Sequence, residues 1–245
     1  MSSPDSYRSL LLELLRRDLI KYLNFRSRVY SEDLPLKTEG VTFGYRLIHS
    51  KNKQQDKMKN FESLKELEKT VLECRECALH KTRNKVVFGK GSAKERLVII
   101  GEAPGGEEDK TGIPFVGRAG QLLTKMLAAI NIERENVYIC NVLKCRPPNN
   151  RDPLPEEIRK CSFYLDKQLE FLKPRYILAL GRIAAQRLLG IQTTMKELRG
   201  AIHNYKDIPV IVTYHPSALL RNSKWKYPAW EDLKKLKELL DKPDA

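Results

Sequence analysis

The sequence lacks any long hydrophobic run. No apolar stretch in its 245 residues approaches the roughly 20 residues that a bilayer-spanning helix needs. The leucine-rich start at Leu10–Ile20 is interrupted by Glu13, Arg16, Arg17 and Asp18, which also argues against a secretory signal peptide. We therefore expect a cytoplasmic protein that is neither exported nor held in a membrane.

Cysteine is scarce and odd in number. The five cysteines come without an export signal, so ligation of a metal or cluster explains them better than a disulfide framework does. Cys74 and Cys77 form a C-x2-C pair, and fifteen residues separate Cys145 from Cys161. From spacing alone, structural zinc and an iron–sulfur cluster are equal interpretations. Cys140 lies inside an apolar stretch, and we interpret it as a small buried hydrophobic residue.

Acidic residues are outnumbered by basic ones. Against 45 lysines and arginines stand 31 aspartates and glutamates, which gives a formal net charge of +14 and a pI of about 9.5. A surplus of this size attracts polyanions and indicates a nucleic-acid partner, although it does not specify a fold. With 41% hydrophobic and 31% charged residues, the composition is that of a globular protein.

The first 60 residues differ in pattern from the remainder. Leucines at helical spacing between residues 11 and 23 predict an amphipathic helix, either docked on the main domain or used to bind a partner. A short strand over 40–48 and a lysine-rich polar linker over 49–60 follow. We therefore divide the chain into an N-terminal extension, 1–60, and a domain, 61–245.

From residue 61 onward, short apolar runs alternate with helical patterns. The pattern predicts strands at 97–100, 137–143, 175–180 and 208–213, and helices at 64–72, 117–130, 155–172, 183–189 and 230–240. Strands that alternate with such helices pair in parallel through right-handed crossovers. We predict an α/β fold with a doubly wound, mainly parallel four-stranded sheet flanked by helices. Its ligands should bind at the carboxyl ends of the strands.

Chemically unusual loops follow three of these strands. Gly101–Asp109 combines glycines, which let a ligand approach the backbone, with four acids, and it lacks both the phosphate-loop and the dinucleotide signature. Its acids suit the activation of a water or the stabilisation of a developing cation. Asn141 ends the second strand, and His215 follows the fourth in a proline turn. By spacing alone, each loop is weak evidence of a site.

Taken together, the loops resemble those of one known family. Its motifs are carried in chain order by Gly101–Gly105, Lys110–Gly120, Asn141–Arg151 and His215–Ser217, over about residues 61 to 225. The combination resembles the iron–sulfur uracil-DNA glycosylases, the thermostable fourth family of archaea and bacteria. The resemblance implies the uracil-DNA glycosylase fold and a base-excision repair enzyme. Such an enzyme hydrolyses the N-glycosidic bond of deoxyuridine in DNA and leaves an abasic site.

The resemblance also implies roles for individual residues. The cysteines Cys74, Cys77, Cys145 and Cys161 would hold a structural [4Fe–4S] cluster beside the DNA. Phe115 would stack on the extruded uracil, Asn141 would bind its edge, and His215 would stabilise the charge that develops on O2. Further substrate contacts would come from Gly101, Ala103 and Glu108. The DNA would be bound by Arg146, Arg151, Ser217, Leu219 and Arg221, with Leu219 entering the space that the base vacates.

One departure from the wider superfamily bears on mechanism. The best-studied relatives, in the first family, carry Asp where this sequence has Ala103, and that carboxylate is missing throughout the fourth family. Glu102, Glu108 and Asp109 are nearby replacements, and we favour Glu102 as a catalytic residue that acts electrostatically on a cation-like sugar. No lysine stands out as a Schiff-base nucleophile, so we expect a monofunctional enzyme.

Alternatives to this reading stay open. One is a glycosylase for hypoxanthine or xanthine, and another is a cluster-bearing DNA-binding protein without activity. A zinc-bound nucleic-acid module is the third, whereas a covalently trapping relative would need a Gln in the first motif and a basic insertion that this sequence lacks. We expect a monomer that binds uracil-containing DNA, single- or double-stranded, with any protein partner bound by the N-terminal extension.

Overall fold

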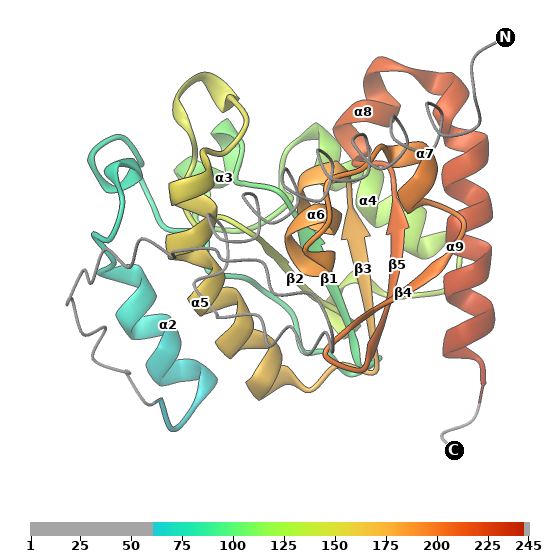
Figure 1. Cartoon of the computed structure of the whole chain (residues 1–245), viewed down its shortest axis with the longest axis horizontal. Coiled ribbons are helices and arrows are strands. Elements are labelled where there is room, and N and C mark those ends of the chain that lie inside the picture. The colour runs from blue at the N-terminus through green and yellow to red at the C-terminus, as the bar shows by residue number, and fades with distance from the viewer. Residues whose placement is uncertain (1–60, 243–245) are drawn as a thin grey trace, which may run out of the picture.

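The computed structural model of the chain describes residues 61–242 (Figure 1). The helix, strand and linker expected within residues 1–60 lie outside this range. Within it, no helix combines the length and the apolar character that crossing a membrane requires.

A five-stranded sheet forms the centre of the described domain, with the strands in the order β2-β1-β3-β5-β4 (Figure 1). The strands are β1 (Leu97–Gly101), β2 (Tyr138–Asn141), β3 (Tyr176–Leu180), β4 (Ile202–Tyr205) and β5 (Ile208–Thr213). β1 pairs in parallel with β2 and β3, and β3 pairs in parallel with β5. The predicted doubly wound, mainly parallel α/β sheet is therefore confirmed.

The predicted number of four strands is wrong, because β4 pairs antiparallel with β5 and extends the sheet. Lys206 and Asp207 form the two-residue turn between them, both in the left-handed region with φ of 46° and 67°. Such turns usually carry Asn-Gly or Asp-Gly, so Lys-Asp gives little signal in the sequence. Ile202 and Asn204 are exposed, which removes the apolar run that marked the other strands.

Helices cover both faces of the sheet (Figure 1). The cluster on one face includes residues of α2 (Leu64–Leu72), α5 (Pro155–Leu172) and α6 (Arg182–Leu189). The cluster on the other face includes α4 (Arg118–Ala128), α8 (Pro216–Arg221) and α9 (Lys226–Leu240). Shorter elements are α3 (Gly106–Thr111), α7 (Met195–Leu198), and the 3-10 turns η1 (Ala78–Lys81), η2 (Arg134–Asn136), η3 (Pro148–Asn150) and η4 (Ser223–Trp225).

Strand β1 shows why its sequence is an uninterrupted apolar run. Val98 and Ile100 pack in the core beneath α2 and α5, whereas Leu97 and Ile99 pack beneath α4 and α9. Successive side chains of a strand point to opposite faces, so a strand covered on both faces must be apolar at every position.

The strand order reverses at β1 and β3, the central pair of the parallel sheet. From β1 the chain passes outward to β2, and from β3 it passes in the opposite direction to β5. In open α/β sheets, ligands bind outside the carboxyl ends of the strands at such a reversal. We therefore expect a ligand site beside Gly101, which ends β1, and Gly181, which follows β3.

Candidate active site and cysteine pocket

A pocket opens at the carboxyl ends of the strands. It is lined by loops that follow β1, β2, β3 and β5. Of the residues singled out in the sequence, the lining includes Glu102, Ala103, Glu108, Phe115, Asn141, Arg151, His215, Ser217 and Arg221. The topology thus brings together residues that lie more than a hundred positions apart in the chain.

Gly101, Phe115 and Asn141 meet in close contact in this pocket. A Cβ atom on residue 101 would stand 2.4 Å from Asn141 Oδ1 and 2.5 Å from Phe115 Cζ, so only glycine fits there. Asn141 is 1% exposed, and its Oδ1 accepts no hydrogen bond from the described residues. A buried acceptor without a donor is costly, and a bound ligand can supply that donor. The amide is therefore suited to bind a molecule that presents an N–H group.

The backbone around Phe115 is held in an unusual conformation by Arg134. Phe115 has a φ of 52°, which is uncommon for a bulky residue. Arg134 Nη2 donates to the carbonyl oxygens of Pro114 at 2.8 Å and Phe115 at 3.0 Å, and Nη1 donates to Thr124 Oγ1 at 3.2 Å. Arg134 lies in η2, outside every motif, so sequence reasoning missed it. It anchors the loop that presents the aromatic ring.

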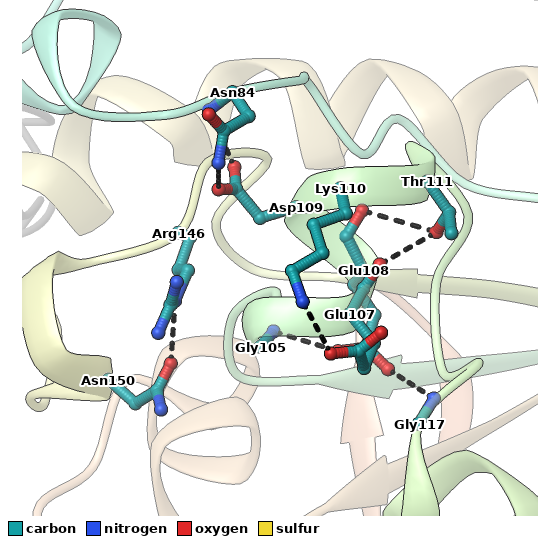
Figure 2. A network of polar contacts seen from close by, with 10 residues as sticks. All are labelled: Asn84, Gly105, Glu107, Glu108, Asp109, Lys110, Thr111, Gly117, Arg146 and Asn150. Atoms are coloured by element: carbon teal, nitrogen blue, oxygen red, sulfur yellow. Dashed lines mark hydrogen bonds and ion pairs between the residues drawn. The ribbon is translucent and has the colours of Figure 1, made fainter.

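Glu108 holds the other side of the same loop (Figure 2). Its Oε2 accepts the backbone N–H of Gly105 at 3.1 Å, and its Oε1 accepts those of Val116 and Gly117 at 2.9 Å. Both oxygens are engaged by backbone N–H groups, which favours a positioning role for Glu108 although it lines the pocket, and its contact with substrate stays a prediction. The carboxylate ties α3 to the loop after Phe115 and acts as a positioning residue.

Both carboxylate oxygens of Asp109 also accept hydrogen bonds from within the chain. Its Oδ1 accepts the backbone N–H of Asn84 at 2.9 Å, and its Oδ2 accepts the Asn84 side-chain amide at 2.6 Å (Figure 2). Glu107 pairs with Lys110 at the surface at 2.9 Å. These partners leave neither carboxylate suited to activate a water in the pocket.

Glu102 differs from these three acids. It lines the pocket directly after β1, and in the described part of the chain its carboxylate accepts no hydrogen bond. Burial, and to a smaller extent the Asp152 carboxylate, raise the pKa of Glu102 to about 7, while Arg182 opposes the shift. A pocket carboxyl that titrates near neutrality is typical of a catalytic group.

His215 presents a single N–H donor to the pocket. Its Nδ1 accepts the backbone N–H of Ser217 at 3.2 Å and lies 2.8 Å from Ser217 Oγ, so the neutral ring carries its proton on Nε2. Burial, followed by the charge of Arg221, lowers the pKa of His215 to about 4. The ring is therefore neutral at pH 7, with its centroid 5.5 Å from that of Phe115.

The structure contradicts the predicted role of Leu219. Its side chain is 2% exposed and packs in the core beneath α4 and α9, so it cannot enter DNA. The next residue, Leu220, is 44% exposed. Adjacent residues of a helix are rotated by about 100°, and the role that the resemblance implies was carried onto the inner of two adjacent leucines.

Two of the predicted DNA-binding arginines are bonded to neighbours. Arg146 Nε donates to Asn150 Oδ1 at 2.8 Å (Figure 2), and Arg151 binds both carboxylate oxygens of Glu157, at 2.9 and 2.6 Å. Arg151 and Arg221 also line the pocket, which places positive charge at its mouth.

The four predicted metal-binding cysteines line a second, smaller pocket. Cys74 and Cys77 follow α2, Cys145 follows β2 and Cys161 lies on α5, so three chain segments converge there. All are free thiols, and Arg83 Nη1 donates to Cys145 Sγ at 3.2 Å. Over residues 61–242, no three His, Cys, Asp or Glu side chains are arranged to hold one metal ion.

Two further residues border this region. Cys140 is fully buried in the apolar core outside the cysteine pocket, as predicted. Lys144 is 1% exposed, lines the cysteine pocket and donates from Nζ to the Asn141 carbonyl oxygen at 2.7 Å. Lys144 thus connects the two pockets, and no sequence pattern indicates this contact because lysines are rarely buried.

Comparison with known proteins agrees with this geometry. The family model for the uracil DNA glycosylase superfamily matches residues 88–234. The chain is 47% identical over 189 residues to a type-4 uracil-DNA glycosylase of Archaeoglobus fulgidus, covering 74% of this chain and 95% of that protein. A type-4 enzyme of Thermotoga maritima is 47% identical over 176 residues, 70% and 92% of the two chains. One of Sulfurisphaera tokodaii is 42% identical over 191 residues, 74% and 87%.

Proposed function

This chain belongs to the uracil-DNA glycosylase superfamily, and we propose that it is a monofunctional DNA-repair enzyme. It hydrolyses the N-glycosidic bond of deoxyuridine in DNA, releasing uracil and leaving an abasic site. The observation that supports this most strongly is the buried, unpaired Oδ1 of Asn141 beside the rings of Phe115 and His215.

Asn141 and Phe115 bind the base. Uracil offers an N–H donor at N3 and an acceptor at O4, which match the Oδ1 acceptor and Nδ2 donor of the amide. Cytosine presents an acceptor at N3 and an amine at C4, so both contacts would be mismatched. Phe115 supplies the stacking surface, and Arg134 and Glu108 fix its backbone. A base inside a duplex cannot reach this pocket, so the nucleotide must be extruded.

His215 acts on the leaving group. As the glycosidic bond breaks, negative charge develops on uracil O2, and the Nε2–H of a neutral imidazole can donate to it. A donor that is already oriented stabilises this charge without reorganisation. Ser217 keeps the ring in the required tautomer by donating its backbone N–H to Nδ1.

Glu102 acts on the sugar. The transition state of glycosidic cleavage resembles an oxocarbenium ion, which an ionised carboxylate stabilises electrostatically. Since the pKa of Glu102 is about 7, half of its population is ionised near neutral pH. The same carboxylate is suited to orient the attacking water.

We further propose that Cys74, Cys77, Cys145 and Cys161 hold a [4Fe–4S] cluster. The four thiols line one pocket, and no three ligand side chains in the described range are placed to hold one metal ion. Four cysteine thiolates can bind either one zinc or an iron–sulfur cluster. The similarity to type-4 uracil-DNA glycosylases supports the cluster. When bound, the group supplies a structural cross-link between the end of α2, the loop after β2 and α5.

Excision assays test the proposed function directly. Oligonucleotides carrying uracil, hypoxanthine, xanthine or cytosine should be incubated with the full chain and analysed with and without alkaline cleavage. We expect release of uracil, with strand breaks only after alkali. Equal excision of hypoxanthine, or no excision of uracil, would overturn the assignment. The monomeric state, the cytoplasmic location and a protein partner for residues 1–60 stay predictions.

A further inference from the structure

We propose that Trp225 is a stacking platform for a nucleobase adjacent to the extruded deoxyuridine, on the strand that carries it. The inference rests on the proposed function, because it places the DNA across the mouth of the pocket described above. Three groups of observations carry it, namely the packing, the exposure and the charge around Trp225.

Trp225 belongs to a buttressed stack of planar groups. Its ring lies nearly parallel to that of Tyr214, with centroids 4.9 Å apart and an angle of 6° between the planes. The guanidinium carbon of Arg199 lies 4.4 Å from the Tyr214 centroid. Arg199 is itself fixed by both oxygens of Asp232, at 2.7 and 3.0 Å, and by the Pro228 carbonyl at 2.5 Å. One face of the indole is thus held by Tyr214, which is itself supported by Arg199.

The indole nevertheless remains open at the mouth of the pocket. Trp225 is 39% exposed although it stacks on Tyr214. Both residues line the pocket that contains His215 and Asn141. Tyr214 directly precedes His215, so the stack is continuous in sequence with the catalytic loop. The exposed face of Trp225 therefore offers a flat apolar surface to the DNA strand whose uridine enters the pocket.

The charge around Trp225 favours nucleic acid over an apolar protein segment. Residues 221–226 read Arg-Asn-Ser-Lys-Trp-Lys and contain three cations and no acid. Aromatic side chains flanked by basic residues are how proteins bind unpaired strands, with bases on the rings and phosphates on the cations. Extrusion of the uridine removes one stacking partner from its neighbour, and Trp225 can replace that partner. The effect should be larger in single-stranded DNA, where no opposite strand holds the neighbouring base.

Fluorescence tests the contact without relying on catalysis. The chain contains two tryptophans, Trp225 and Trp230, so Trp230→Phe leaves Trp225 as the sole indole emitter. Titration with a single-stranded oligonucleotide carrying 2′-fluoro-deoxyuridine, whose glycosidic bond resists hydrolysis, should quench this emission saturably. Trp225→Phe, in which Trp230 emits alone, should show no quenching. Binding without quenching of Trp225 would overturn the proposal.

Kinetics supply the second readout. Trp225→Ala should lower kcat/KM on single-stranded uracil DNA about tenfold, the order expected for one lost base-stacking contact, mainly through KM. Trp225→Tyr should restore most of the loss. Tyr227→Ala is the matched control, because Tyr227 is 74% exposed in the same segment and does not line the pocket. An unchanged KM for Trp225→Ala, or equal losses in both alanine variants, would overturn the platform. Failure of the wild-type chain to excise uracil would instead overturn the proposed function, and the quenching test would still stand.

Discussion

The pocket at the strand ends and the pocket lined by cysteines are maintained in different ways. In the first, groups of the chain hold one another: Glu108 accepts three backbone N–H groups, and Arg134 donates to two backbone carbonyls. In the second, thiols from three segments face one space, and burial raises the pKa of Cys77, Cys145 and Cys161. Contacts within the chain therefore organise the strand-end pocket, whereas the links between the three segments of the cysteine pocket would come from the cluster that we propose.

Substitutions in the two pockets should therefore have different effects. Changes to the groups that act on substrate in the strand-end pocket should alter chemistry while leaving the fold intact, because the surrounding loops are held by other residues, Glu108 and Arg134. Substitutions in the cysteine pocket should lower the iron content of the proposed cluster before they affect the rate of excision. Lys144 donates to the Asn141 carbonyl and lines the cysteine pocket, so it is a direct contact between the two regions.

The largest effect is expected for Asn141→Asp. The substitution replaces the amide donor that faces uracil O4 by an acceptor, so excision of uracil should fall by roughly 10⁴-fold, as at sites built to hydrogen-bond their substrate. Single-turnover assays on uracil and cytosine oligonucleotides measure this, and weak release of cytosine is expected. A rate within tenfold of the wild type would mean that Asn141 does not bind the base.

His215→Ala should have the next largest effect. It removes one donor aimed at a developing anion, which costs about 10² to 10³ in rate at comparable sites. Affinity for uracil-free DNA should change little, since the cations at the pocket mouth remain. If binding were abolished while the single-turnover rate persisted, His215 would be a docking residue.

Arg134→Gln tests the support of Phe115. Loss of the two contacts to the Pro114 and Phe115 carbonyls should slow excision roughly tenfold, less than the 10²-fold that a 1 Å misplacement can cost. Arg134→Lys should recover part of the rate, and thermal unfolding identifies any general loss of stability. Equal rates for Gln and the wild type would show that the loop needs no such anchor.

The pH profile isolates Glu102. Because the ionised form is active and the pKa is about 7, the single-turnover rate should rise about tenfold per pH unit below 7 and level off above it. Asp152→Asn removes the negative charge that helps raise this pKa and should move the profile to lower pH, and Glu102→Gln should flatten it. The raised pKa also means that the folded state binds this proton more tightly. Its contribution to stability is therefore full below pH 4.5 and lost as the pH rises through 7.

The smallest effect is expected for the iron content of Cys140→Ser, because Cys140 lies in the core outside the cysteine pocket. Iron should stay at about four per chain under anaerobic purification, whereas Cys145→Ser should lose it. One zinc and no iron in the wild type would show that the four cysteines do not hold an iron–sulfur cluster. Loss of iron in Cys140→Ser would show that the ligand set is assigned wrongly.

Sequence patterns predicted what depends on periodicity and chain order. The helix Pro155–Leu172 matches its expected range because a first-turn proline followed by two acids marks its start. The strand-end residues Glu102, Asn141 and His215 meet because parallel strands end at one edge of the sheet. The resemblance assigned the wedge to Leu219, and only the structure shows that Leu219 is buried while Leu220 is exposed.

Contacts between distant segments escaped prediction for a related reason. In the sequence, Glu108 and Asp109 resemble acids that act in the pocket. In the structure, Glu108 accepts a hydrogen bond from Val116 and Asp109 accepts one from Asn84. Arg134 and Trp225 lie in segments without a motif, and the contacts behind their proposed roles join distant parts of the chain. The basic residues beside Trp225 are visible in the sequence, but its stacking on Tyr214 is not.

The protonation of His215, measured by ¹⁵N NMR between pH 3 and 8, tests most directly whether the folded chain presents a neutral donor to uracil O2. The chain has four histidines, and comparison with His215→Ala assigns the signal. We predict a neutral ring with the proton on Nε2 and a pKa near 4. A ring that is protonated at pH 6, or that carries its neutral proton on Nδ1, would contradict the claim that the chain alone presents a donor to the leaving uracil.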